Sequence, residues 1–342
     1  MLKLLLSVIV IFMLNGLESS AMLQNECEPS DELRPIWSPT SQTIVFMNGN
    51  ATNIDIFTIE ADGSNLTNLT ESSLAHDYRP SWSPDGEQLV FSSERDGTSD
   101  IWIMNADGSD PINLTPDMEG LQDFGQWSPD GEMIAFVSER MGEADIYDIG
   151  IMNANGSNLT LLTSDERYLF SQPQWMPDSQ SLIFTSADDG ALWFATVESP
   201  PLTRITPSFP ENLAGNAVVS SEEGSIVYTD SVTGDLRLVT EDSQNPTNLT
   251  NTESVMETFP AWSHNGETIA FGCHTKICTM QFDGSDYTQI TDGSEHIEDW
   301  DRLPSWSPDD TYIAFESYRA GTGDIWVMRA DGTDMQNLTC SS

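Results

Sequence analysis

Residues 80–115 read PSWSPDGEQLVFSSERDGTSDIWIMNADGSDPINLT. This stretch holds a tryptophan followed by a Ser-Pro-Asp-Gly turn, runs of β-forming residues, a second turn at Asp107-Gly108 and a closing Asn-Leu-Thr. Proline presets φ for the first turn position and glycine supplies a positive φ, so each turn joins two short strands tightly. The stretch therefore predicts an antiparallel sheet of four strands.

The same pattern recurs along the chain. A degenerate copy carries valine in place of tryptophan, and the seven positions are Trp37, Trp82, Trp127, Trp175, Val219, Trp262 and Trp306. Four strands repeated at this spacing are typical of β-propeller blades. We expect an all-β protein, a seven-bladed β-propeller of four-stranded antiparallel blades over residues 33–342, with six blades as the alternative. The expected blades cover approximately residues 33–70, 79–115, 124–163, 172–206, 216–250, 259–291 and 303–339.

The order of motifs within each copy resembles a known repeat. Pro-x-Trp-Ser-Pro-Asp-Gly, Ile-Ala-Phe, Asp-Ile-Trp and Asn-Leu-Thr follow one another as in the WD40-like propeller repeat of TolB-related proteins, and the resemblance covers residues 33–339. TolB itself carries an α/β domain before a six-bladed propeller, and this pattern departs from it in both respects. The resemblance therefore implies the fold and not the Tol–Pal role. Peptidases of the prolyl oligopeptidase type carry a similar repeat beside a separate hydrolase domain, which we do not expect in this chain.

The N-terminus predicts export. Lys3 precedes an apolar run from Leu4 to Leu14, and the small residues Ser19 and Ala21 follow. This is the pattern of a secretory signal peptide over residues 1–21, with cleavage expected after Ala21 and residues 22–32 as a linker. The run is shorter than the ~20 residues that span a bilayer. We expect a secreted or periplasmic protein without stable membrane insertion.

The charge balance narrows the classes of partner. The net charge is −43, from 55 acidic and 12 basic residues. Such a surface repels nucleic acids and anionic membranes. We therefore expect a protein or peptide partner and no nucleic acid, and we expect a monomer. An acidic coat that serves solubility alone is the alternative interpretation.

Four cysteines predict disulfides in an exported protein. Cys27 and Cys340 flank the repeats, so a bond between them would close the ring. Cys273 and Cys278 bracket a shortened hairpin in the sixth copy, where a cross-hairpin disulfide is expected. The alternative there is a metal site that includes His274, although its spacing matches no recognised zinc pattern.

Two groups of polar residues recur between copies. The first is structural in our interpretation: an aspartate opens the third strand at Asp55, Asp100, Asp145, Asp235 and Asp324, and arginines recur in one hairpin at Arg95, Arg140 and Arg319. The second group precedes the tryptophans by about five positions and could ring the channel mouth: Glu32, Asp77, Asp123, Glu257 and Asp301. Carboxylates in this arrangement are candidate ligands for a cation such as Ca²⁺ or for a basic peptide, with solvated side chains as the alternative.

These observations favour an exported TolB-like propeller that acts as a protein-binding, peptide-binding or scaffold module. We expect no catalysis, no cofactor and no metal centre beyond the Ca²⁺ candidate. The alternative is a metal-assisted carbohydrate-active enzyme, a lyase or glycosidase, that would use the acidic channel mouth.

Overall fold

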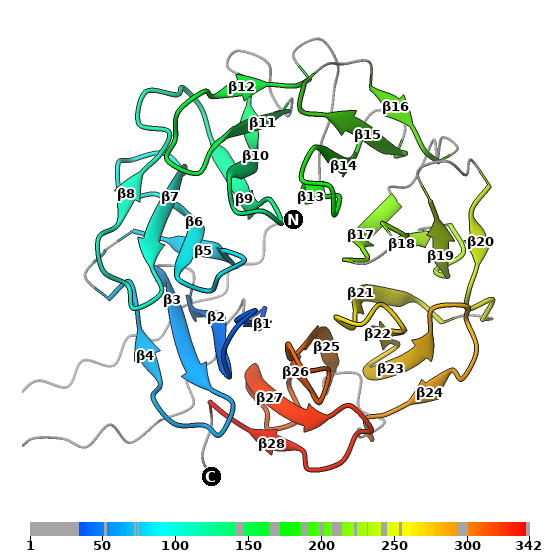
Figure 1. The fold of residues 1–342 in the computed structure, drawn as a ribbon. Coiled ribbons are helices and arrows are strands. Elements are labelled where there is room, and N and C mark those ends of the chain that lie inside the picture. Colours follow the sequence, from blue (N-terminus) through cyan, green and yellow to red (C-terminus); the bar gives the residue numbers. More distant parts are fainter. Residues whose placement is uncertain are drawn as a thin grey trace, which may run out of the picture.

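The computed structural model describes residues 34–50, 53–71, 73, 75–140, 147–163, 172–186, 190–198, 202–206, 214–221, 224–230, 232–240, 245–252, 255–292 and 300–339. Seven four-stranded antiparallel sheets form a ring around a central channel (Figure 1). Every regular element in these residues is a strand. The predicted seven-bladed propeller is confirmed, and the six-bladed alternative is wrong.

Each blade uses four consecutive strands, and the first strand lies nearest the channel (Figure 1). The innermost strands are β1 (Ile36–Trp37), β5 (Asp77–Trp82), β9 (Gln122–Trp127), β13 (Gln174–Trp175), β17 (Ala214–Val219), β21 (Glu257–Trp262) and β25 (Asp301–Trp306). The second strands are β2 (Thr43–Asn50), β6 (Gln88–Ser93), β10 (Met133–Glu139), β14 (Ser181–Thr185), β18 (Ile226–Asp230), β22 (Thr268–Cys273) and β26 (Tyr312–Ser317).

The outer half of each blade completes the sheet. The third strands are β3 (Asn53–Glu60), β7 (Asp100–Asn105), β11 (Tyr147–Asn153), β15 (Leu192–Thr196), β19 (Leu236–Val239), β23 (Lys276–Gln281) and β27 (Asp324–Arg329). The outermost strands are β4 (Thr67–Asn68), β8 (Ile112–Asn113), β12 (Thr160–Leu161), β16 (Thr203–Arg204), β20 (Thr247–Asn248), β24 (Thr288–Gln289) and β28 (Gln336–Asn337). We number the blades 1 to 7 in this order. The turns within strand pairs 1–2 and 3–4 form the turn face, and the other connections form the loop face.

The tryptophans pack between neighbouring blades. Trp82 is buried in a cluster that joins Val45 and Ile56 of blade 1 to Phe91 of blade 2. Its indole N–H donates to the main-chain carbonyl of Ile36, at 3.3 Å. A sheet of four short strands leaves both faces apolar, so stacking on the next blade is what buries them.

Five of the innermost strands, β5, β9, β17, β21 and β25, carry a bulge about three residues before the tryptophan position. In β5 the pairing with β6 shifts between Tyr78 and Ser81, and Arg79 there has φ 53°. The same position has a positive φ in six blades, at Arg34, Arg79, Phe124, Asn216, Phe259 and Leu303. A positive φ costs free energy when the residue carries a bulky side chain. Because this conformation recurs around the ring, it is a feature of the blade fold rather than of one blade.

The closing threonine of every blade ties the outermost strand to the third strand. Its hydroxyl accepts a main-chain N–H from the third strand at 2.9–3.0 Å, and the seven residues are Thr70, Thr115, Thr163, Thr206, Thr250, Thr291 and Thr339. In blade 2 the carboxylate of Asp100 accepts from Thr115 and from Asn113. The structural interpretation of these aspartates agrees with this geometry.

In blade 3 the aspartate that bonds to the closing threonine is Asp148. Asp148 accepts from the Thr163 hydroxyl, at 3.2 Å. Asp145 lies outside the described residues. Asp148 precedes Thr163 by 15 positions, as Asp100 precedes Thr115, so Asp148 holds the equivalent place in blade 3.

Candidate binding site at the channel mouth

The channel mouth is the end at which the innermost strands begin, on the loop face. The structure places Asp77, Glu257 and Asp301 as the first residues of β5, β21 and β25, and Asp123 as the second residue of β9. Glu32 lies outside the described residues. The four described carboxylates are all buried, with at most 5 % of each residue exposed.

Two of these carboxylates form ion pairs with arginines of their own blade. Asp77 accepts two bonds from Arg95, each at 3.1 Å, so the pair is bidentate. Asp301 accepts from Arg319 at 2.5 Å and from the Ser317 hydroxyl at 2.6 Å. Both arginines come from the hairpin that follows the second strand, so the pair ties the innermost strand to this hairpin.

The other two carboxylates have different partners. Asp123 accepts from the Ser92 hydroxyl and from the main-chain N–H of Phe124, both at 2.7 Å, and it pairs with Arg79. Glu257 accepts from the hydroxyls of Thr252, at 2.6 Å, and Thr250, at 3.2 Å.

Burial shifts the pKa of three of these carboxylates. It raises the pKa of Asp77, Asp123 and Glu257 above the usual range, although Arg95 and Arg79 oppose the shift at the first two. Desolvation penalises the charged form, and the partners only partly offset it. Among the described residues no three His, Cys, Asp or Glu side chains gather as a metal site would require. Cation or ligand binding by the acidic ring stays a prediction.

Arginine and aromatic side chains lie beside these carboxylates. In blade 2 the guanidinium of Arg79 lies 4.0 Å from the ring centroid of Phe124 and 5.3 Å from that of Tyr78. The Tyr78 hydroxyl donates to Ser99 at 2.8 Å, and burial raises the pKa of Tyr78 to about 12. The phenol therefore stays protonated at neutral pH.

Blade 7 carries a second unit of the same kind. The guanidinium of Arg302 lies 4.3 Å from the Trp300 ring and 5.9 Å from the Tyr318 ring, and these two rings stack at 5.5 Å. Arg302 also donates two bonds to one oxygen of Glu316, at 3.0 and 2.7 Å. Glu316 is fully buried, whereas 38 % of Trp300 is exposed.

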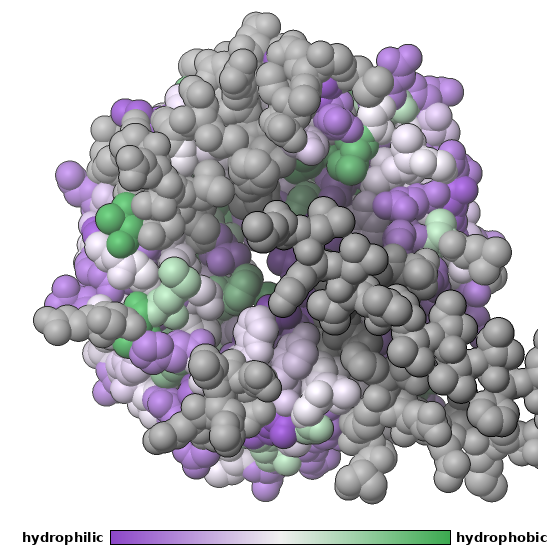
Figure 2. Space-filling model, turned by 180° about the vertical axis from the view of Figure 1, so that it is seen from behind, coloured by the Kyte–Doolittle hydropathy of each residue, from purple (hydrophilic) through white to green (hydrophobic). Residues whose placement is uncertain are grey.

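The sequence-based search missed these two units. That search followed polar residues that recur in several blades, whereas the position of Arg79 holds arginine in only one other copy, at Arg34, and the position of Arg302 holds it in no other copy. The signal that could have found them is the scarcity of basic residues, because only 12 occur in a chain with 55 acidic ones. Figure 2 shows the ring from behind, open near its centre, with hydrophobic as well as hydrophilic residues bordering the opening.

One predicted disulfide is present at the loop face. Cys273 and Cys278 are bonded across the hairpin of β22 and β23, with their Cα atoms 5.8 Å apart. Cys278 takes the third-strand position that Trp102 takes in blade 2, where Arg95 lies 5.3 Å from the indole. The disulfide therefore stands where blade 2 has its arginine–aromatic contact. The predicted Cys27–Cys340 bond lies outside the described residues.

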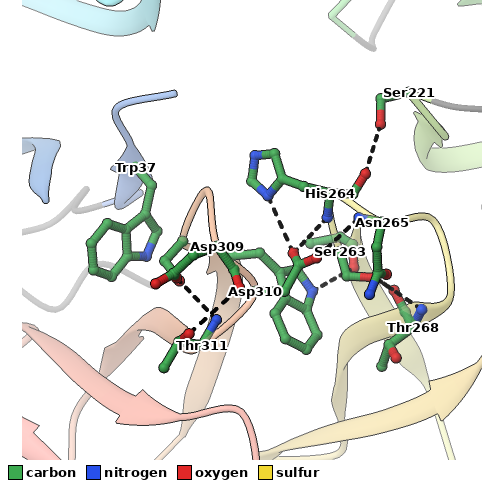
Figure 3. A network of polar contacts seen from close by, with 12 residues as sticks. Trp37, Ser221, Ser263, His264, Asn265, Thr268, Asp309, Asp310 and Thr311 are labelled. Atoms are coloured by element: carbon green, nitrogen blue, oxygen red, sulfur yellow. Dashed lines mark hydrogen bonds and ion pairs between the residues drawn. The ribbon is translucent and has the colours of Figure 1, made fainter. Parts of the chain in front are cut away.

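The turn face holds a network that crosses three blades (Figure 3). His264 replaces the proline of the Ser-Pro-Asp-Gly turn in blade 6, and its main-chain N–H donates to the carboxylate of Asp310 at 2.6 Å. Asn265 N–H donates to the same carboxylate at 3.0 Å, and Ser221 of blade 5 donates to the His264 carbonyl at 3.3 Å. Proline has no N–H, so this link depends on the departure from the repeat pattern.

A comparison with protein-family models assigns the chain to a family. The TolB beta propeller domain model matches residues 9–120 and 113–276. The chain belongs to this family. Of the curated relatives, the Tol-Pal system protein TolB of Syntrophus aciditrophicus is 35% identical over 65 residues, which cover 19% of this chain and 14% of that protein. An uncharacterized protein of Agrobacterium fabrum is 28% identical over 96 residues, which cover 27% of this chain and 31% of that protein. The matches thus span less than a third of either relative.

Solved structures extend the likeness of fold beyond TolB. TolB from Acinetobacter baumannii has a TM-score of 0.52 at 16% identity, over 90% of this chain and 62% of that chain. A puromycin-hydrolyzing peptidase of Mycobacterium tuberculosis has a TM-score of 0.72 at 13% identity, over 91% and 53%. An oligogalacturonate lyase in complex with manganese has a TM-score of 0.68 at 12% identity, over 87% and 89%. At these identities the likeness concerns the fold alone.

Within the described residues, no helix has the length and apolar character that a membrane span requires.

Proposed function

We propose that this TolB-family propeller is an exported module that binds a protein or peptide partner at the channel mouth, without catalysis. The observation that carries the proposal is the exposed Trp300, stacked on Tyr318 beside Arg302. Tryptophan, tyrosine and arginine are the residues that dominate the binding energy of protein interfaces.

The chemistry of the mouth supports binding over hydrolysis. The four described carboxylates that could act as acid, base or metal ligand are buried, and each already accepts hydrogen bonds from its own or a neighbouring blade. The side chains beside them that keep exposed surface include Trp300, Arg79 and Arg302. An active site for glycoside cleavage needs two carboxyl groups that can reach a substrate.

Capture of a partner tests the binding role. The mature chain and a Trp300→Ala variant would be used as bait in envelope and extracellular fractions of the source cells. We expect a partner that the unaltered chain retains and the variant loses, and Tyr287→Ala is the matched control because Tyr287 is also partly exposed but lies at the outer edge of blade 6. Equal capture by Trp300→Ala and the unaltered chain would contradict a binding site at the mouth.

Export is the second part of the proposal and rests on the signal-peptide pattern of residues 1–21. Mass spectrometry of the N-terminus of the protein recovered from cells decides it. We expect a mature chain that begins at Met22, and an intact Met1 in a cytoplasmic fraction would contradict export.

A further inference from the structure

Exposed apolar side chains of the loop face gather in one sector of the ring. Within the described residues eight large hydrophobic side chains are exposed, and five of them belong to hairpins of third and outermost strands. The other three lie on the loop face: Val232 between β18 and β19, Met256 just before β21, and Trp300 just before β25. Blades 5, 6 and 7, to which they belong, are consecutive in the ring (Figure 1). We call these three side chains the apolar arc.

The arc lies at the channel mouth. Met256 and Trp300 occupy equivalent places, because each directly precedes the first residue of an innermost strand. The hairpin of β18 and β19, which carries Val232, lies against Met256. There the Glu257 main-chain N–H donates to the Gly234 carbonyl at 2.8 Å, and a Cβ added at Gly234 would lie 3.2 Å from the Met256 Cα. The arc is therefore presented by backbone that neighbouring blades hold in place.

The apolar character continues from the arc into the channel wall. The bulge positions of β21 and β25 hold Phe259 and Leu303, both half-buried. These two innermost strands lie side by side. Blade 2 differs at both places, with His76 before its innermost strand and Arg79 at its bulge. The sector at blades 6 and 7 is thus apolar at both levels of the mouth.

The arginines of this sector are neutralised by carboxylates. Three of them on the loop face each form an ion pair: Arg237 with Asp230, Arg302 with Glu316, and Arg319 with Asp301. The net charge of the chain, −43, therefore sets the sign of the field that an approaching segment meets. That field attracts a basic segment and repels an acidic one.

The size of the arc favours a short segment over a folded partner. A large aromatic side chain buries about 150–250 Å² when it is fully covered, so three partly exposed residues of at most this size offer on the order of 300 Å². A stable interface buries about 800 Å² on each partner. A second copy of this chain would also bring its own charge of −43 to the contact.

We propose that the apolar arc binds an extended segment of a partner protein in which apolar side chains alternate with lysine or arginine. Alternate side chains of an extended chain point to the same side. The apolar ones cover Met256 and Trp300, and the basic ones stay in solvent, where the acidic surface attracts them. Methionine adapts its shape to different apolar side chains, and tryptophan supplies a rigid contact. The inference rests on the proposed binding function and adds to it the composition of the partner segment.

The experiment uses the mature chain and fluorescein-labelled peptides read by fluorescence anisotropy. The probe is Gly-Lys-Leu-Lys-Phe-Lys-Gly. One comparison peptide replaces its leucine and phenylalanine with serine, and the other replaces its three lysines with glutamate. At low salt we expect each comparison peptide to bind about tenfold more weakly or worse, because one loses apolar burial and the other meets a repulsive field. Added salt should narrow the gap between the lysine and glutamate peptides.

Variants locate the site. Met256→Ser and Trp300→Ala should each weaken the probe about fivefold to tenfold, since each removes one apolar contact. Their matched controls are Ile112→Ser and Tyr287→Ala, because Ile112 is 57 % exposed against 58 % for Met256, Tyr287 is 40 % exposed against 38 % for Trp300, and both lie outside the arc. The controls should stay within about twofold of the unaltered chain. Thermal unfolding checks folding, and Val232→Ser replaces a variant that fails to fold.

A lipid surface is the other partner that exposed apolar loops can contact. Flotation of the mature chain with phosphatidylcholine vesicles separates it from a peptide, and we expect the protein to stay out of the vesicle fraction. Flotation that Met256→Ser abolishes would overturn the peptide inference in favour of membrane docking.

The peptide results separate the two levels of the proposal. Equal or tighter binding of the serine or the glutamate peptide, binding of none of the three, or binding that Met256→Ser and Trp300→Ala leave unchanged overturns the inference. If capture of a cellular partner still depends on Trp300 in these cases, the proposed binding function stands and only the composition assigned to the segment fails.

Discussion

Asp77 and Asp85 belong to the same blade and differ in almost every physical respect. Asp85 lies exposed in the Ser-Pro-Asp-Gly turn, where the Ser83 hydroxyl, at 2.6 Å, and the Glu87 main-chain N–H, at 3.0 Å, lower its pKa. Asp77 lies buried at the channel mouth, where desolvation raises its pKa against the opposing charge of Arg95. The turn face uses aspartate as a local hydrogen-bond acceptor, whereas the loop face uses carboxylates as buried anchors between distant segments.

The largest expected effect comes from removing a buried anchor. Asp77→Ala leaves Arg95 without its bidentate partner, and the Arg95 side chain is only 17 % exposed. Breaking one partner of a buried pair costs about 3–5 kcal/mol. Urea unfolding of the variant should show a loss of this order, and a loss below about 1 kcal/mol would mean that water replaces the carboxylate.

Removing the Cys273–Cys278 disulfide of blade 6 tests whether this bond takes the place that the Asp77–Arg95 ion pair has in blade 2. Its two cysteines are five positions apart, and the chain-entropy model gives a loop of this size about 2 kcal/mol. Cys273→Ser combined with Cys278→Ser should lower the free energy of unfolding by that amount. Unchanged stability would show that this hairpin needs no anchor, unlike its counterpart in blade 2.

The pH dependence of stability should have opposite signs on the two faces. Glu257 has its pKa raised, mainly by burial, so the stability it contributes is present below the unfolded value of 4.5 and is lost as pH rises through its folded pKa. Glu257→Gln should therefore stabilise the protein at pH 7 relative to the unaltered chain, with a difference that vanishes below pH 4.5.

Asp85 should give a pH dependence of stability of the opposite sign in the same measurements. Its pKa is lowered, so its stability is present above the unfolded value of 3.8 and is lost as pH falls through the folded pKa. The unfolding midpoints of Glu257→Gln and of Asp85→Asn, measured between pH 3 and 8, give the comparison. A Glu257→Gln variant that is less stable at pH 7 would show that the hydroxyl bonds outweigh desolvation.

The smallest effect is expected at the turn itself. Asp85→Asn should change stability by less than about 0.5 kcal/mol at pH 7, as for surface changes that keep their contacts. Blade 6 already has Asn265 at this position, where its side-chain oxygen bonds Ser263 and the Glu267 N–H as Asp85 does in blade 2. Thermal unfolding with a shift of several degrees would mean that the charge itself matters there.

What the sequence predicts well is what forms locally. The turns, the blade count and the Cys273–Cys278 bond depend on residues a few positions apart, and the structure bears them out. In blade 3 the bond to the closing threonine is made by Asp148, and the predicted Asp145 lies outside the described residues.

What the sequence predicts poorly is which residues lie buried at the mouth. The partner of Asp77 is 18 positions away in the next hairpin, and Arg79 reaches a carboxylate of the following blade. Such contacts depend on how the blades stack and on the positive φ at the bulge, and neither leaves a periodic mark in the sequence. The acidic positions were visible, but their burial and pairing were not.

The seam between blades 7 and 1 has one further consequence. Every described sheet is built from four consecutive strands, and Trp37, Ile44 and Phe46 pack on Ala314 and Ile325 much as the other neighbours pack. Within the described residues, closure thus uses the same kind of side-chain packing as the other joints, and no strand is exchanged across it. The ring has no privileged starting point, so a chain cut in the connection between blades 5 and 6 and rejoined through a linker at the seam should fold into the same seven blades.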